Sequence, residues 1–240
     1  MALPQINTVP YYDIVIPSTG QKTRYRPYLV KEEKVLLIAL ESQDPTQIFN
    51  ATVNLISSCL DIDYDIDLLT TYDIEYAFTQ IRSKAVGETL QVNVMCQNAP
   101  CEEYSEVQIR LDDIKVGTFD EKTRTIQLTD EVSLQMRHLP YKEAISNPQI
   151  VSPETFAEQM FHTVVSCIDA VCTEEERIST TDSTREELET FVEALTTKQF
   201  NLLRDFVENT PTISKDVEFK CSSCGSDNKY RLTGLQDFFE

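Results

Sequence analysis

Residues 218–232 read EFKCSSCGSDNKYRL, with Cys221 and Cys224 three positions apart at their centre. A glycine follows the second cysteine, and apolar residues alternate with polar ones on both sides. This pattern predicts a strand, a tight turn and a returning strand. A pair of cysteines at such a turn is typical of one half of a zinc site. The stretch therefore predicts half of a metal centre, and the other half has to come from elsewhere in the chain.

A matching half occurs in residues 92–111, VNVMCQNAPCEEYSEVQIRL, where Cys96 and Cys101 also lie between two predicted strands. Two such hairpin tips facing each other would place four thiolates around one cation, the closed tetrahedral set that Zn²⁺ takes in structural sites. We therefore predict a structural zinc site made of Cys96, Cys101, Cys221 and Cys224. The CQNAPC loop is two residues longer than the usual knuckle, so free thiols, or a site lost in one half, stay as the alternative.

The CSSC sequence also occurs in dithiol oxidoreductases, which gives a redox alternative. Those proteins place the pair at a helix N-terminus, which lowers the thiol pKa. Here the pair lies between predicted strands, which favours the metal site. The other three cysteines, Cys59, Cys167 and Cys172, fall on apolar faces of predicted helices. We interpret them as small buried hydrophobic residues.

The rest of the chain predicts an α+β protein in five segments. Residues 1–28 alternate like an extended N-terminal arm, and residues 29–87 form a helical region with the periodicity and capping residues of helices. Residues 88–150 are expected to form an antiparallel β region carrying the first cysteine pair. Residues 151–213 are expected to be a helical insertion. Residues 214–240 are then a C-terminal cysteine hairpin that packs on the β region, so a helical insertion interrupts a zinc-ribbon-like module.

Several details of the helices can be checked against a structure. The first helix should bury an apolar stripe made of Leu29, Val35, Leu36, Ala39 and Leu40. Residues 153–172 should form one largely buried helix. Ser183 and Glu186 are spaced as a capping box for the next helix, which we expect to break near Thr196.

Composition excludes several classes of protein. The 240 residues carry a formal net charge of -19, whereas binding to phosphate backbones needs clustered Lys and Arg. We therefore expect no nucleic acid partner and no membrane partner. No segment has the apolar length of a membrane span, and the first residues lack the features of a signal peptide, so reduced thiols are expected. We find no Gly-rich phosphate loop and no catalytic constellation, and predict that the protein is not an enzyme.

One basic stretch stands out in the N-terminal half, at residues 19–34. Its candidate partner-binding residues are Arg24, Arg26, Tyr28 and Lys31. They could dock an acidic surface of another protein. They could equally dock the acidic helical region of the same chain, because residues 151–195 carry eleven acidic and two basic residues.

The C-terminal end offers a second candidate for partner binding. Residues 232–240 read LTGLQDFFE, and Leu235, Phe238 and Phe239 are the candidate anchors. Exposed aromatic residues at a chain end can fill a pocket on a partner. The alternative, which stays open, is that they cover the protein's own cysteine hairpin.

Four segments, in order, resemble the baseplate hub protein family of T-even-like contractile-tailed bacteriophages. They are IPSTGQKTRYRPYLVKEEKVLLIA at 16–39, LTTYDIEYAFTQIRSKAVGE at 69–88, the strand pair around CQNAPC at 96–101, and CSSCGSDNKYRLTGLQDFFE at 221–240. The helical insertion carries less of the resemblance. The family's tail hairpin carries a cysteine pair that maps onto Cys221 and Cys224.

The resemblance implies a non-enzymatic tail protein that is either a component of the baseplate hub or a factor that helps the hub to form. Its partners would be other tail and hub proteins. It would be found in the host cytoplasm during assembly, or in the baseplate of the virion tail. The cysteine pattern by itself leaves another function open, a zinc-ribbon adaptor or regulator that binds a host or viral complex such as a transcription complex.

Overall fold

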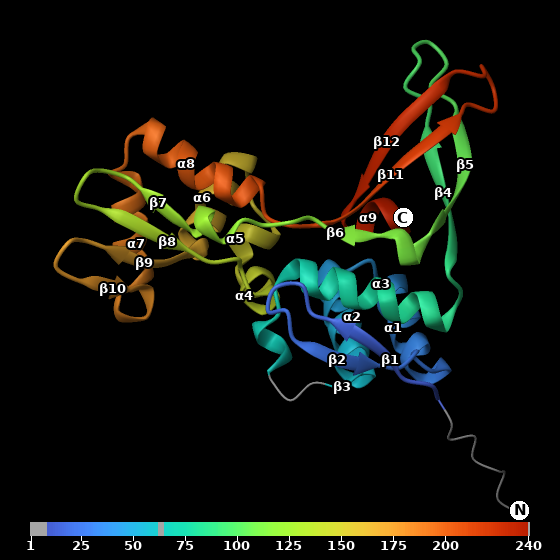
Figure 1. Cartoon of the computed structure of the whole chain (residues 1–240), viewed down its shortest axis with the longest axis horizontal. Helices are drawn as coiled ribbons and strands as arrows, with labels where there is room; N and C mark the ends of the chain where they lie inside the picture. Colours follow the sequence, from blue (N-terminus) through green and yellow to red (C-terminus); the bar gives the residue numbers. More distant parts are fainter. Residues whose placement is uncertain (1–8, 62–64, 240) are drawn as a thin grey trace, which may run out of the picture. The chain divides into compact units, whose positions relative to one another are not determined.

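The protein is described by a computed structural model that covers residues 9–61 and 65–239 (Figure 1). Its contacts divide the chain into two units. Unit 1 contains the described residues up to Gly117 and those from Thr212 onward, and unit 2 is Thr118–Pro211. Unit 2 is therefore an insertion between two parts of unit 1. Within the described part of the chain, no helix combines the length and apolar character that crossing a bilayer requires.

Unit 1 opens with a small antiparallel sheet. Strands β1 (Tyr12–Val15) and β2 (Lys22–Tyr25) form a hairpin, and β2 also pairs with the two-residue strand β3 (Leu60–Asp61). Gly20 has a φ of 68° in the connecting turn, a conformation that favours glycine. Residues 1–8 of the predicted extended arm lie outside the described residues.

Helices follow in the order α1 (Val30–Ser42), α2 (Pro45–Cys59), a 3₁₀ turn η1 (Ile66–Leu68) and α3 (Thr71–Ala85). The side chain of Asp44 accepts hydrogen bonds from the first backbone N–H groups of α2, so the predicted cap is present. Helix α3 starts with a capping box of Thr70 and Asp73. Asp73 is fully buried and also accepts from the amide of Ser18, which ties α3 to the β1–β2 turn.

The remainder of unit 1 is the hairpin module. It consists of β4 (Thr89–Met95), β5 (Tyr104–Arg110), the 3₁₀ turn η2 (Leu111–Asp113), β6 (Lys115–Val116), β11 (Ile213–Lys220), β12 (Asp227–Thr233) and α9 (Gly234–Phe239). β4 pairs with β5, and β11 lies between β12 and β6. Figure 1 shows the green and red hairpins side by side although they are distant in the chain. Inward residues of both hairpins share one core that includes Val92, Ile109, Val217 and Leu232.

Unit 2 is an antiparallel sheet with helices. Its elements are η3 (Glu121–Arg124), β7 (Thr125–Gln127), β8 (Ser133–Met136), α4 (Tyr141–Ser146), α5 (Pro148–Val151), α6 (Phe156–Cys167), β9 (Ile168–Cys172), β10 (Arg177–Ser179), η4 (Thr180–Asp182), α7 (Arg185–Glu193) and α8 (Thr197–Glu208). The strand order is β10-β9-β8-β7. Leu134, Val164, Ile168 and Leu203 lie at the centre of its core.

The fold is mixed α+β with several antiparallel sheets, as predicted, but the insertion is larger than the sequence indicates. The structural boundary lies at Thr118 and not near residue 151. The reason is strand pairing, because β8 pairs with β9, which follows the first long helix of the insertion. The predicted helix at 153–172 was therefore too long, and it ends at Cys167 before strand β9.

Two smaller predictions were wrong. In α1 only Ala39 of the predicted stripe is buried, whereas Leu29, Val35 and Leu40 are exposed. The capping box of α7 is made by Thr184 and Glu187, one residue after the predicted pair. The predicted break near Thr196 is confirmed, since Thr196 caps α8.

Candidate metal centre

The tips of the two hairpins bring the four predicted cysteines together. Their sulfur atoms all lie within 4.8 Å of one another. Two sulfur pairs join the hairpins, with 3.7 Å between the Sγ atoms of Cys96 and Cys224 and 3.7 Å between those of Cys101 and Cys221. All four are free thiols. The chain separation in the second pair is 120 positions, so the cluster is a product of the fold and not of local sequence.

Backbone hydrogen bonds close the loop at each hairpin tip. In the second hairpin the amide of Cys221 donates to the carbonyl of Ser226 over 2.9 Å, and the amide of Gly225 donates to the carbonyl of Cys221 over 2.9 Å. Gly225 has a φ of 72°, which explains the glycine after the second cysteine. In the first hairpin the amide of Cys96 donates to the carbonyl of Glu103 over 2.9 Å. Both turns hold their cysteines in fixed positions.

Polar contacts also join one tip to the other. The buried side chain of Asn228 accepts from the amide of Gln97 over 2.8 Å. Ser105, which is also buried, accepts from the amide of Ser222 over 3.2 Å. The side-chain amide of Asn98 donates to the hydroxyl of Ser226 over 3.0 Å. These contacts orient the ligand-bearing loops in the way that outer-shell groups support metal sites.

Sequence analysis did not identify these supporting residues. One signal for Asn228 exists, because it stands four residues before the buried Leu232 and therefore shares the inward face of β12. A polar residue at an inward position has to find a hydrogen-bond partner. Ser105 carries the same signal, because it shares the inward face of β5 with Ile109. Asn98 lies in a loop and carries no such signal.

The cysteines differ in acidity. Hydrogen bonds from Ser226, and then from Asn98, lower the pKa of Cys224 to about 5. The backbone N–H groups of Cys224 and Ser223 lower the pKa of Cys221. At Cys101 the amide of Glu103 acts in the same direction, but desolvation and the neighbouring thiols outweigh it and raise the pKa to about 11. The cysteines with a lowered pKa thus lie in the second hairpin, and the raised pKa of Cys101 belongs to the first.

The cluster fits Zn²⁺ in donor type and size. Tetrahedral zinc with Zn–S bonds of 2.3 Å requires sulfur atoms about 3.8 Å apart. Two pairs lie at 3.7 Å, and no pair exceeds 4.8 Å. Four sulfur donors leave no open position, so a bound ion would be structural and not catalytic. Cys96 and Cys221 are buried, which also matches a closed site.

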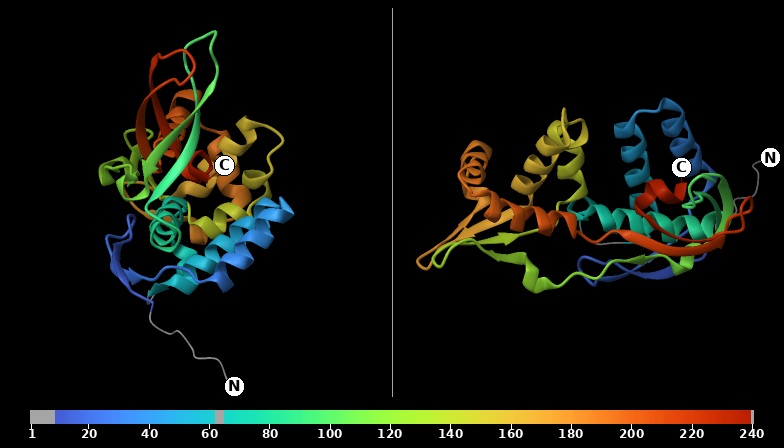
Figure 2. Two further views of the ribbon diagram at one scale, coloured as in Figure 1. Left: turned by 90° about the vertical axis from the view of Figure 1, so that its right-hand side faces the viewer. Right: turned by 90° about the horizontal axis from the view of Figure 1, so that it is seen from above.

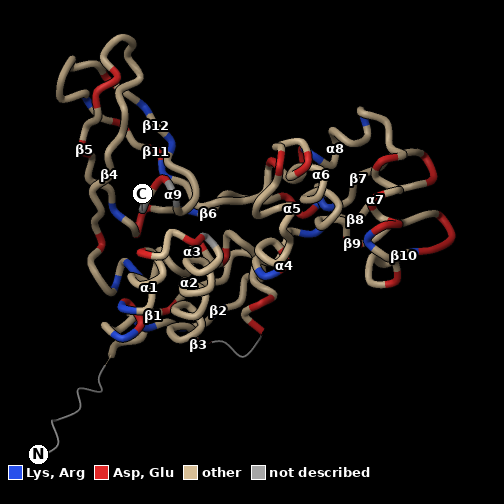
Figure 3. The backbone as a smooth tube through the Cα atoms, turned by 180° about the vertical axis from the view of Figure 1, so that it is seen from behind, with Lys and Arg blue, Asp and Glu red and all other residues tan. Residues whose placement is uncertain are grey.

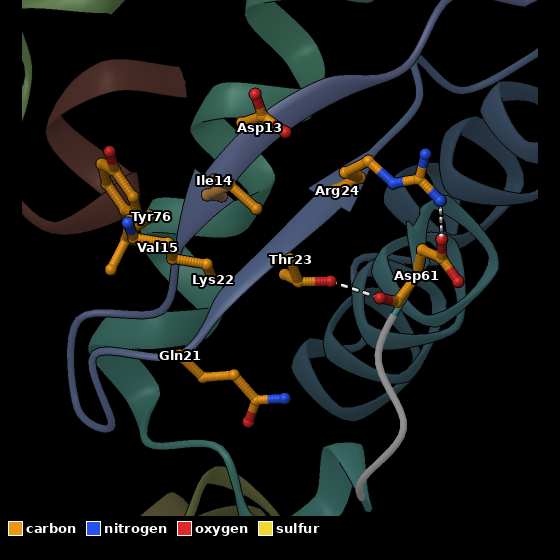
Figure 4. Close-up of a pocket in the computed structure, with 9 residues that line it drawn as sticks. All are labelled: Asp13, Ile14, Val15, Gln21, Lys22, Thr23, Arg24, Asp61 and Tyr76. Carbon is orange, nitrogen blue, oxygen red and sulfur yellow. Dashed lines mark hydrogen bonds and ion pairs between the residues drawn. The ribbon is translucent and has the colours of Figure 1, made fainter.

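The predicted basic surface has its partners within unit 1. The guanidinium of Arg24 lies 2.8 Å from the carboxylate of Asp61, on an exposed pair that Figure 4 shows in the groove beside β1 and β2. Arg26 is largely buried, and it pairs with Glu32 at 3.1 Å and donates to the carbonyl of Ser58 over 2.8 Å. The partners of these two arginines are thus not in the acidic helical region.

The other two residues of that surface differ from each other. Tyr28 is half-buried, and desolvation raises its pKa. Lys31 is exposed beside Glu32, with 3.3 Å between the charged groups. Arg24 and Lys31 are therefore exposed, whereas Arg26 contributes to the fold of unit 1.

The candidate anchors at the C-terminal end are Leu235, Phe238 and Phe239, and the structure describes the side chains of the first two. Phe238 is 2% exposed and belongs to the core of the hairpin module, with Leu235 packed against that core. Phe238 is therefore wrong as an exposed anchor, because α9 turns it towards the strands. The side chain of Phe239 lies outside the described residues. For Phe238, the structure favours the alternative in which this end covers the cysteine hairpins.

Comparison with known proteins gives the family. The chain is similar, over 89 residues with 30% identity, to "Baseplate hub assembly protein gp26" of Enterobacteria phage T4. That match covers 37% of this chain and 42% of the relative. No solved structure matches the chain. The family described as "T4 bacteriophage base plate protein" matches residues 9–240. The chain therefore belongs to the T4 bacteriophage base plate protein family.

Proposed function

We propose that the protein acts in formation of the central hub of a phage baseplate, as a hub component or as a hub assembly factor. The observation that carries this proposal is the family match over residues 9–240, together with a relative that is named for hub assembly. The action would consist of contacts with other tail proteins and would involve no chemical step. The place of action would be the host cytoplasm during assembly, or the baseplate itself.

The proposal includes a structural Zn²⁺ held by Cys96, Cys101, Cys221 and Cys224. The four-sulfur geometry supports it. The ion would join the tips of two hairpins whose cysteines are 120 positions apart in the chain. Because the site forms only in the folded chain, the free energy of metal binding would add to the stability of the fold. A hub protein could then present the hairpin module as a rigid element.

Surface charge supports a role in protein–protein contact. Figure 3 shows Asp and Glu on the segments around β10 and α7 in unit 2. Glu174, Glu175, Glu176, Glu186 and Glu187 are exposed there. Such a surface would favour partners with basic faces and disfavour phosphate backbones. Arg24 and Lys31 in unit 1 are candidate contacts for an acidic face of a partner.

A deletion strain tests the hub role. We expect phage that lack the protein to accumulate incomplete baseplates, seen by electron microscopy of infected-cell lysates, and a plasmid copy to restore complete tails. Mass spectrometry of purified particles then separates the two forms of the proposal. A hub component is retained in mature particles, whereas an assembly factor is absent from them.

Normal tails in the deletion strain would contradict the proposal. So would affinity purification from infected cells that recovers a transcription complex in place of tail proteins, because that result fits the zinc-ribbon adaptor. Complementation with a Cys221→Ser variant isolates the role of the metal site. We expect it to fail, and a Cys172→Ser copy, changed at a cysteine outside the cluster, to succeed.

A further inference from the structure

Helix α1 of unit 1 presents apolar side chains to the outside. Val30 is 78% exposed, Leu37 53% and Ile38 57%, and Val35 and Leu40 are also exposed. Ala39 is the one buried residue in α1, which packs on α2. Sequence periodicity predicted a buried stripe here, and the structure places most of that apolar surface in contact with solvent. Exposed apolar surface concentrated on one helix marks a candidate interaction site.

The neighbouring helix α2 shows that exposed apolar residues are not a general property of this helix pair. Figure 2 shows α1 and α2 as a pair of blue helices joined by a short turn. From Thr46 to the end of α2, the exposed residues are all polar: Thr46, Gln47, Asn50, Asn54, Ser57 and Ser58. The two helices have comparable lengths and both face solvent, yet only α1 is apolar on its outer side. Solvation alone therefore does not account for the composition of α1.

The outer face of α1 is complementary to itself. Successive residues of a helix are rotated by about 100°, so Val30, Lys34, Leu37, Ile38 and Glu41 lie on one face, opposite Ala39. If a second α1 packs antiparallel across a two-fold axis between residues 37 and 38, Lys34 faces Glu41 of the copy. Leu37 then faces Ile38 of the copy. Each contact occurs twice, as a two-fold interface requires.

The charges agree with that arrangement. Within the described part of the chain, neither Lys34 nor Glu41 has an ion-pair partner, whereas Lys31 is paired with Glu32. The helix carries Lys31, Lys34, Glu32, Glu33 and Glu41, which nearly balance. A nearly neutral surface lessens the repulsion between copies of a protein with a formal net charge of -19.

We propose that α1 is a homotypic interface through which two copies of this chain associate, with their α1 helices antiparallel. The helix is 13 residues long, or about 20 Å, so the contact is smaller than a standard stable interface. The dimer is therefore weak and reversible in dilute solution. A larger fraction of the protein is dimeric where copies are concentrated. The proposal does not depend on the metal site or on the hub assignment.

Sedimentation equilibrium of the full-length protein, from micromolar to millimolar concentration, tests the interface. We expect a reversible monomer–dimer equilibrium that Ile38→Glu abolishes. Lys34→Glu and Glu41→Lys should each weaken the dimer about tenfold, because each places like charges opposite one another. The double variant restores the pairing and should regain most of the affinity. Asn54→Glu, on the polar face of α2, is the matched control and should leave the dimer unchanged.

Zero-length cross-linking of mixed ¹⁴N and ¹⁵N protein gives a direct readout. We expect a Lys34–Glu41 cross-link between a light and a heavy chain. A monomer at every concentration would overturn the proposal, and so would a dimer that Ile38→Glu does not affect. If the protein stays monomeric and Ile38→Glu removes a tail protein from affinity purifications, the face serves a different partner, and the homotypic interface is wrong. Circular dichroism of each variant checks that the fold is kept.

Discussion

At the scale of single residues, Asn228 shows how the chain supports its cysteine cluster from outside. Its side chain is buried in one hairpin and accepts a hydrogen bond of 2.8 Å from Gln97 in the other. It also donates to the carbonyl of Ser226 over 2.8 Å, within its own turn. One amide side chain thus fixes both loops that carry the sulfur atoms, which makes its removal a test of the site that leaves every ligand in place.

We expect Asn228→Ala to weaken zinc binding roughly tenfold, because outer contacts of metal ligands have effects of that order. The loss of a buried hydrogen bond should also lower the free energy of unfolding by about 1–2 kcal/mol. Competition with a chromophoric chelator measures the first effect, and denaturant unfolding the second. Asn93→Ala, on the outer face of β4, is the control. Equal zinc affinity in both variants would show that the contact does not support the site.

Glu75 is a second side chain with a defined set of partners. It belongs to α3 and lies against Thr212, where the chain enters β11. Burial raises the pKa of its carboxyl group, although Thr212 and the amides of Ile213 and Leu235 all donate to it. The folded state therefore binds this proton more tightly than the unfolded state does. The resulting stability is fully present below the ordinary pKa of 4.5 and is lost as the pH rises through the raised value.

Glu75→Gln removes this titration, so the pH dependence of wild type and variant should differ. As the pH falls from neutral, we expect wild type to gain stability relative to the variant, because only the wild-type side chain takes up a proton more tightly in the folded state. Denaturant unfolding over a pH series gives the difference, in which the contributions of the other carboxylates cancel. Glu106→Gln, at an exposed position on β5, serves as control. A difference that is flat or shrinks as the pH falls would contradict this account of Glu75.

At the scale of elements, the start of α7 is the best place to test how local sequence sets a boundary. The sequence offers two overlapping capping boxes, one on Ser183 and one on Thr184. The structure uses the second. The hydroxyl of Thr184 accepts from the amide of Glu187 over 3.2 Å, and the Glu187 carboxylate accepts from the amide of Thr184 over 2.8 Å.

Thr184→Ala should therefore destabilise unit 2 by about 1 kcal/mol, the usual cost of losing an N-cap. Ser183→Ala should change the free energy of unfolding by a few tenths of that at most. Thermal unfolding of the two variants side by side makes the comparison. A larger loss at Ser183 than at Thr184 would mean that α7 begins one residue earlier than the structure shows.

Much of the element structure was predictable, because strand alternation and capping residues are local signals. The hairpins around Cys96 and Cys221 and the break at Thr196 belong to this group. The end of α6 at Cys167 was not predictable from period alone, because Ile168 and Val171 suit either a buried helix or a strand that pairs with β8. The exposed face of α1 was missed for a related reason, since periodicity locates an apolar face but does not say what covers it.

The candidate metal site also combines features that local sequence predicts with features that only the fold brings together. The four cysteines could be proposed from spacing, because zinc ligands recur in paired turns. The contacts of Asn98 and Ser105 could not be predicted, because their partners, Ser226 and Ser222, come from the other hairpin. Phe238 was assigned to a partner because a chain end is usually accessible, and α9 folds it into the core instead.

At the scale of the whole molecule, unit 2 is an insertion whose two ends meet. The amide of Gly117 donates to the carbonyl of Thr212 over 3.0 Å, so the chain leaves and re-enters unit 1 at adjacent positions. The core of the hairpin module draws its residues from unit 1 on both sides of that point. Unit 1 should therefore hold its structure, and its cysteine cluster, without the insertion.

We expect a variant in which a short Gly-Ser linker replaces Thr118–Pro211 to fold and to bind one metal ion per chain. Circular dichroism and metal analysis of the purified variant check this, with full-length protein as reference. An aggregated or metal-free product that zinc does not rescue would show that the insertion is needed to form unit 1.

The central claim is that one Zn²⁺, held by Cys96, Cys101, Cys221 and Cys224, joins the two hairpins. Zinc K-edge X-ray absorption of the full-length protein, with metal content measured on the same sample, tests it most directly. The account predicts one zinc per chain with four sulfur neighbours at about 2.3 Å. It also predicts loss of the metal in Cys96→Ser and its retention in Cys172→Ser. Protein that binds no zinc when the metal is supplied, or zinc with nitrogen or oxygen ligands in place of sulfur, would contradict the account.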